Sequence, residues 1–199
     1  MVTMEYSECL VCGKFSEDGT THLSCRNDVV PSSFVSVFKY CSLVRSVIRR
    51  AKYARREFLG LRIISEAAAE IVKEEFSQMT KYVLIPVPIS DERLRTRGFN
   101  QVTTITKALS KKTSMVVNTR ILLRNVDSRP QYTNNRLDRY DNVKGAFSIR
   151  KGHENLVTHG KFLLADDICT SGATLLEASK TLYENGASDV KCFALSRKV

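Results

Sequence analysis

The stretch LLADDICTSGATLLEA, residues 163–178, joins an apolar run, two adjacent acids and a loop of small and hydroxylated residues. The run KFLLADD predicts a buried strand, and the sequence from Thr174 to Asn185 predicts a helix. Gly186 suits the position just after a helix end, and DVKCFAL then predicts a second strand. Two apolar strands joined by a helix are typical of a parallel α/β sheet.

Upstream segments extend this pattern. We expect a small Cys-rich module over residues 1–30 and one α/β domain, a parallel sheet flanked by helices, over residues 31–199. The expected strands are 34–40, 82–90 and a short one in MVVN, and the expected helices are 42–58, 61–79 and 100–111. The polar run 125–146 lacks a sustained period and predicts a long loop.

Composition restricts the class of protein. The 199 residues are 43% hydrophobic, which is enough for a packed core. No run approaches the length of a membrane span, and the start lacks a secretory signal pattern, so we expect a cytoplasmic protein with no membrane insertion. The 31 Lys and Arg outnumber the 21 Asp and Glu, giving a formal charge of +10. This balance favours anionic partners, although charge alone selects none.

The chemistry of the 163–178 stretch fits a sugar phosphate. At the start of a helix, free N–H groups and the hydroxyls of the loop 170–174 favour a phosphate. Asp166 and Asp167 would repel that phosphate, but they suit ribose hydroxyls or a phosphate-bound Mg²⁺. The alternative is an ordinary helix cap, which explains one polar residue but leaves two acids, a glycine and further hydroxyls without a role.

The segment LLADDICTSGATL resembles the phosphoribosyl pyrophosphate motif of type I phosphoribosyltransferases at every defining position. The resemblance implies that Asp166 and Asp167 bind the ribose hydroxyls at the catalytic centre. It also implies that five loop residues bind the 5-phosphate: Thr170, Ser171, Gly172, Ala173 and Thr174. Cys169 reads as a packing residue, because no paired base is evident near it.

Three further segments resemble the ComF branch of these proteins: RRAKYARREFLG, IPVPISDERLRTRGFNQ and RPQYTNNRLDRYDNVKGAF. In the second, Arg93, Arg95, Arg97 and Gly98 are expected to bind pyrophosphate, with the alternating arginines of an extended turn pointing one way. The third is expected to form a lid from about Val126 to Asn142, with Arg129, Gln131 and Arg136 as its contacts. For any single arginine, a solvated surface position is an equally good interpretation.

The ComF resemblance also implies a zinc site of two Cys-x-x-Cys pairs near the N-terminus. The chain has Cys9, Cys12 and Cys25, but Asp28 stands where a fourth cysteine is expected. Asp28 completes the predicted set, and His22 is the alternative, since zinc accepts oxygen and nitrogen ligands. A third reading is that the site has decayed and the cysteines are inert.

Two functions follow from these patterns. The first is an enzyme that binds phosphoribosyl pyrophosphate, or a nucleotide 5′-phosphate, with Mg²⁺ and transfers the phosphoribosyl group to an acceptor. The second is a non-catalytic adaptor for single-stranded DNA, since the resemblance implies a role in DNA uptake with competence proteins such as a DNA translocase. A basic stripe on the expected helix 42–58 is its candidate DNA surface: Arg45, Arg49, Lys52 and Arg56.

Overall fold

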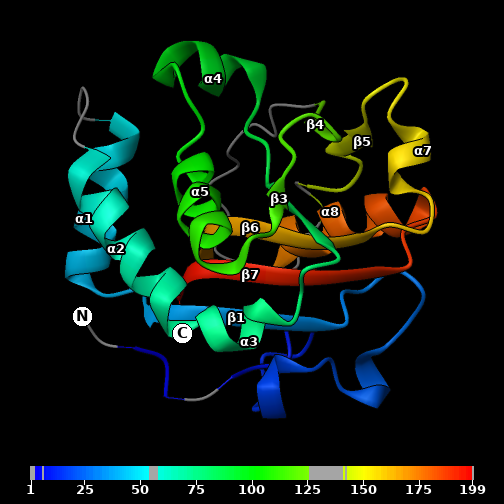
Figure 1. Ribbon diagram of the computed structural model, residues 1–199, viewed down its shortest axis with the longest axis horizontal. Helices are drawn as coiled ribbons and strands as arrows, with labels where there is room; N and C mark the ends of the chain where they lie inside the picture. The colour runs from blue at the N-terminus through cyan, green and yellow to red at the C-terminus, as the bar shows by residue number, and fades with distance from the viewer. Residues whose placement is uncertain (1–2, 6, 54–57, 126–140, 142, 199) are drawn as a thin grey trace.

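The computed structural model describes residues 3–5, 7–53, 58–125, 141 and 143–198. Within these ranges, five parallel strands form the main sheet in the order β1-β7-β6-β2-β3, and β4 pairs with β5 in a separate antiparallel hairpin (Figure 1). The strands are β1 Ser33–Lys39, β2 Tyr82–Pro86, β3 Val116–Val117, β4 Leu122–Arg124, β5 Phe147–Ile149, β6 Lys161–Cys169 and β7 Asp189–Arg197. The parallel sheet confirms the predicted fold class.

Helices cover both faces of this sheet (Figure 1). They are α1 Ser42–Tyr53, α2 Phe58–Ile71, α3 Lys73–Ser77, α4 Asp91–Arg97, α5 Val102–Thr113, α7 Glu154–Val157 and α8 Ala173–Glu184, with 3-10 turns at Glu17–Gly19 and Leu23–Cys25. One core packs α1, α2, α3 and α5 on one face, and a second core packs α8 and the β4–β5 hairpin on the other. Successive β6 residues alternate between them, because Leu163 joins the first core and Leu164 the second.

The segment 161–197 folds as its pattern predicts. Strand β6, helix α8 and strand β7 follow in order, and Gly186 has the positive φ of 91° expected just after the helix. Elsewhere, the expected strand 82–90 ends at Pro86, and the expected helix 61–79 is divided at Val72 into α2 and α3. The short elements β4, β5 and α7 give no pattern long enough to predict.

The arginine-rich turn is helical, and the prediction of an extended chain is wrong. Ser90 begins the helix by accepting a hydrogen bond from the Arg93 backbone N–H at 3.4 Å, and Gly98 ends it with a φ of 78°. Acids in the first turn and arginines in the last turn both stabilise the helix dipole. The helix places Arg93 and Arg97 on one face and Arg95 on another.

The N-terminal segment packs onto the body of the sheet. Isolated bridges join Thr3 to Phe38 and Thr20 to Ser33, and fully buried Leu10 belongs to the same core as α8. In the described ranges, every helix is too short or too polar to cross a membrane.

Candidate functional site

Asp166 and Asp167 lie in β6 at the point where the neighbouring strand has ended. The pairing of β2 with β6 stops at Pro86 and Ala165, whereas the pairing with β7 continues to Cys169 and Arg197. The acids therefore stand inside a strand, one step past the carboxyl end of β2, at the edge where parallel sheets place their ligands. Because they are adjacent in a strand, their side chains face opposite sides of the sheet.

Asp167 is held by a network of fixed polar contacts. Its Oδ2 accepts from Lys52 Nζ at 2.6 Å and from Gln101 Nε2 at 2.8 Å, and its side chain is 6% exposed. The other amide atom of Gln101, Oε1, is buried and has no hydrogen-bond partner among the described residues. The negative charge of Asp167 is thus compensated by Lys52, and the buried Gln101 Oε1 beside it can still accept a hydrogen bond.

Asp166 has a different environment. It lines a small cavity together with the loop residues 170–174, and its Oδ1 accepts from the backbone N–H of Asp167 at 2.8 Å. Burial, followed by repulsion from the Asp167 charge, raises the pKa of Asp166 to about 7. An opposite charge brought by a ligand would therefore stabilise its ionised form.

The loop after β6 leads into α8 without a capping side chain. Gly172, with a φ of 84°, precedes the first helical residue, and neither acid caps the helix. Ser171 Oγ accepts from the Ala173 N–H at a long 3.4 Å. Capping therefore does not explain the two acids, and the start of α8 presents its backbone N–H groups beside Asp166.

The predicted DNA stripe is divided by the structure. Arg45 and Arg49 are exposed on α1, as predicted, but Lys52 reaches the acid pair with a side chain that is 19% exposed. Its assignment to the DNA surface is therefore corrected. Arg56 lies outside the described residues. Lys52 stands in the quoted RRAKYARREFLG segment, but the pattern gave no partner for it.

Helix α4 connects to the same end of α1. Arg97 Nη2 donates to Tyr53 Oη at 3.3 Å, and its guanidinium lies 5.1 Å from the centre of the Tyr53 ring. Arg93 and Arg97 are half-buried, whereas Arg95 is exposed. The structure therefore separates the three arginines that were predicted to act together.

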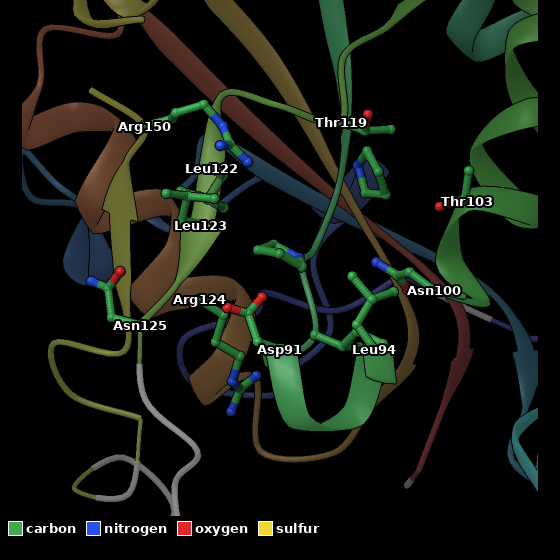
Figure 2. Close-up of a pocket in the computed structure, with 13 residues that line it drawn as sticks. Asp91, Leu94, Asn100, Thr103, Thr119, Leu122, Leu123, Arg124, Asn125 and Arg150 are labelled. Carbon is green, nitrogen blue, oxygen red and sulfur yellow. The ribbon is translucent and has the colours of Figure 1, made fainter. Parts of the chain in front are cut away.

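A cavity of about 600 Å³ lies between α4, the end of β2 and β4 (Figure 2). The α4 side chains that line it are Asp91 and Leu94, and its cations are Arg124 and Arg150. The remaining lining is mixed: Pro86, Pro88, Ile89, Asn100, Thr103, Thr119, Leu122, Leu123 and Asn125. Its size and mixed lining suit a small organic ligand. Pro86 lines this cavity and pairs with Ala165, the residue before Asp166, so one wall of the cavity lies on the strand next to the acid pair, although neither acid lines it.

The predicted lid falls largely outside the described residues, and this includes Arg129, Gln131 and Arg136. The strands before and after it are described: β4 and β5 pair antiparallel, from Leu122–Ile149 to Arg124–Phe147. The assignment of the lid stays a prediction.

Three cysteines and a histidine gather near the N-terminus. The ligand atoms of Cys9, Cys12, His22 and Cys25 all lie within 4.8 Å of one another. In a zinc tetrahedron with Zn–S bonds of about 2.3 Å, ligand atoms stand roughly 3.8 Å apart, so this group is close to the required size. Asp28 is exposed and outside the group, so the fourth position belongs to His22, the alternative ligand.

The surroundings of the cluster suit metal binding. His22 Nε2 donates to the Phe15 carbonyl at 2.9 Å, which leaves Nδ1 facing Cys12 Sγ at 3.3 Å. Burial acts to raise the pKa of the Cys9 thiol, but backbone N–H groups, including those of Cys12 and His22, outweigh it and lower the pKa. By contrast, burial raises the pKa of Cys169 to about 11, which agrees with a packing role.

Similar proteins carry related names. Competence protein ComFC of Streptococcus pneumoniae is 32% identical over 145 residues, which cover 73% of this chain and 61% of that protein. Competence protein ComFC of Bacillus subtilis is 28% identical over 95% of this chain and 77% of that protein. DNA utilization protein YhgH of Escherichia coli O157:H7 is 25% identical over 82% and 71%. The chain belongs to the ComF family. No protein-family model matches it.

Two solved phosphoribosyltransferase-type structures resemble this ComF-family chain at low scores. A glutamine phosphoribosylpyrophosphate amidotransferase from Bacillus subtilis has a TM-score of 0.45 at 15% identity, covering 74% of this chain and 30% of that one. A hypoxanthine phosphoribosyltransferase from Staphylococcus aureus has a TM-score of 0.44 at 11% identity, covering 69% and 68%. Because both TM-scores are below 0.5, the fold is assigned from the order and direction of the strands in the sheet.

Three contacts of this ComF-family site were not predicted. Gln101 stands in the quoted GFNQ segment, but the pattern gave no partner for it. Arg197 donates to the Thr170 carbonyl at 2.6 Å and pairs with Glu8 at 2.9 Å. Glu8 and Arg197 lie 189 positions apart, so no local pattern connects them.

Proposed function

We propose that this chain binds phosphoribosyl pyrophosphate with Mg²⁺ and transfers its phosphoribosyl group to an acceptor. The observation that carries this proposal is the position of Asp166 beside the uncapped start of α8. A carboxylate next to the backbone N–H groups of a helix start suits a ligand with hydroxyls at one end and a phosphate at the other.

The two acids take unequal roles in this proposal. Lys52 already compensates Asp167, so Asp167 and Gln101 orient the edge of the site. Asp166 is left to meet the ribose hydroxyls or a phosphate-bound Mg²⁺, a hard cation that prefers oxygen ligands. The 5-phosphate would lie against residues 170–174.

In the proposed transfer, the bond between ribose C1 and the pyrophosphate oxygen breaks, and pyrophosphate leaves with the bonding electrons. A bond forms from C1 to the acceptor, which loses a proton. Arginines of α4 would stabilise the leaving group, and the adjoining cavity of about 600 Å³ offers room for the acceptor. Positioning and electrostatics would supply the rate, since no covalent protein nucleophile is needed.

The test is calorimetric titration of the protein with phosphoribosyl pyrophosphate, with and without Mg²⁺. We expect Mg²⁺-dependent binding that falls at least about 100-fold in Asp166→Asn/Asp167→Asn, because the hydroxyl contacts and their charge are lost. The control is Glu17→Gln/Asp18→Asn, which removes two exposed charges at residues that do not line the loop cavity and should bind normally. Equal binding by both double variants would falsify the assignment.

We further propose one structural Zn²⁺ on Cys9, Cys12, His22 and Cys25, supported by their convergence and by the Phe15 contact of His22. Stoichiometric zinc in the purified protein, lost in Cys25→Ser but kept in Cys41→Ser, is the expected result. Absence of zinc from the unmodified protein would remove this site from the proposal.

Single-stranded DNA is the second candidate ligand, in a cytoplasmic role beside competence proteins. Tyr53 is 70% exposed at the end of α1, with Arg97 over its ring and exposed Arg45 and Arg49 along the same helix. An exposed aromatic ring flanked by cations suits base stacking combined with backbone contacts. The names of the relatives, competence and DNA utilization proteins, agree with this surface.

A further inference from the structure

The Cys9–Cys12 turn lies directly against the proposed phosphate loop. Leu10, between the two cysteines, is fully buried and packs in one core with Ala173, the first residue of α8. A Cβ at Gly172 would stand 2.9 Å from Leu10 Cδ1 and 3.3 Å from the Leu10 carbonyl oxygen. The turn and the loop are therefore in contact, and a side chain at Gly172 would crowd Leu10.

A buried ion pair makes a second connection between the same two segments. Glu8, immediately before Cys9, accepts from Arg197 Nε at 2.9 Å, and both side chains are only 6% exposed. Arg197 Nη1 also donates to the Thr170 carbonyl at 2.6 Å and to Cys169 Sγ at 2.8 Å. A buried ion pair holds its geometry firmly, because separating its partners leaves an uncompensated charge.

These contacts flank Cys9 on both sides. Glu8 reaches the first residue of the loop through Arg197, and Leu10 supports Gly172 in its middle. A bound metal would hold the Cys9 turn in place. Any shift of that turn changes the Glu8–Arg197 ion pair and the Leu10–Gly172 contact together. The loop carries the backbone donors proposed to bind phosphate, so its order sets the affinity for that ligand.

We propose that Glu8, Leu10 and Arg197 are positioning residues that couple the Cys₃His metal site to the phosphate loop. Metal on the cluster orders residues 170–174, and a phosphate ligand on the loop strengthens metal binding by the same factor, because coupling between two sites is reciprocal. The ligand half of this statement rests on the proposed function, whereas the loop-ordering half does not.

The first measurement is amide hydrogen exchange of the full chain, zinc-loaded and after chelation. We expect residues 170–174 to exchange at least about tenfold faster without zinc, while the centre of β7 is unchanged. In Arg197→Gln, zinc still binds at full stoichiometry, but exchange in the loop no longer responds to it. If Arg197→Gln does not melt cooperatively, Leu10→Ala serves as the uncoupling variant.

The matched control is Lys39→Gln. It removes the partly exposed ion pair between Lys39 in the sheet and Glu5 in the N-terminal segment. It should keep the full response of the loop to zinc. A loop that exchanges equally with and without zinc would overturn the proposal, as would an Arg197→Gln protein whose loop responds to zinc as fully as the unmodified one.

The second measurement separates this coupling from the proposed function. Affinity for phosphoribosyl pyrophosphate with Mg²⁺ should fall about 5- to 100-fold on zinc removal, and zinc affinity should rise by the same factor with ligand present. Loop exchange that responds to zinc, with no binding of this ligand in either state, supports the coupling and removes the proposed ligand. Ligand binding that is indifferent to zinc overturns the coupling and keeps the ligand.

Discussion

Asp166 and Asp167 are adjacent in the chain, but folding places their side chains in different environments. Asp167 gains Lys52 and Gln101 as partners on folding, whereas Asp166 gains burial and a like charge. The Asp166 pKa rises from 3.8 to about 7, so the folded state binds more protons than the unfolded state between these values. Stability from this group is therefore present below pH 4 and is lost as the pH rises towards 7.

We predict that Asp166→Asn stabilises the ligand-free protein at pH 8 by roughly 1–3 kcal/mol, with a smaller gain at pH 5, because the neutral amide removes the cost of burying a charge. Asp167→Asn should destabilise it at pH 8, since Lys52 loses its partner. Urea unfolding of both variants at the two pH values measures this. A change of the same sign at pH 8 for both variants would contradict the described environments.

Helix α4 shows how an element changes the meaning of its residues. In an extended chain, Arg93, Arg95 and Arg97 would share one side, but in a helix the first and last share a face and the middle one turns away. Arg93 and Arg97 are half-buried, Arg95 is exposed, and Arg97 contacts Tyr53. The proposed pyrophosphate contacts are therefore these two.

We predict that Arg93→Gln/Arg97→Gln weakens binding of phosphoribosyl pyrophosphate about tenfold or more, the loss of one charge-assisted hydrogen bond. Arg95→Gln should change it less than about twofold. Titration of the three proteins with inorganic pyrophosphate provides a second readout of the same contact. A dominant effect of Arg95 would show that α4 presents a different face to the ligand.

At the scale of the whole molecule, the formal charge of +10 is informative only where it is concentrated. The exposed cations of α1 lie near exposed Tyr53, whereas Lys107 and Lys111 lie exposed on α5. These two pairs of cations contribute equally to net charge, so comparing them separates a specific DNA surface from a general electrostatic attraction.

We predict that Arg45→Gln/Arg49→Gln weakens binding of single-stranded DNA and lowers the salt slope by roughly 1–2 units, as expected from losing two phosphate contacts. Lys107→Gln/Lys111→Gln should leave the slope nearly unchanged. Fluorescence anisotropy over a salt series measures both. Equal losses in the two variants would place the DNA surface elsewhere or make the binding a general charge effect.

The sequence was sufficient where local signals were long. β6, α8 and β7 follow from unbroken apolar periodicity and a well-placed Gly186, and the phosphate motif lies within this unit. Prediction failed at α4, because prolines and arginines suggested an extended turn, while the Ser90 cap and the charge order favour a helix. At the cysteine cluster, the cysteine spacing suggested Asp28 with His22 as the alternative, and the folded turn brings His22 to the three cysteines.

By itself, then, the sequence determined the parallel sheet, the paired acids and their loop, because these depend on neighbours within about one strand and one helix. The tertiary structure alone decided that Lys52 belongs to Asp167, and that Glu8 and Leu10 reach the loop through Arg197 and Gly172. Such contacts join residues far apart in the chain, and they form only when packing of the two cores fixes where each element ends.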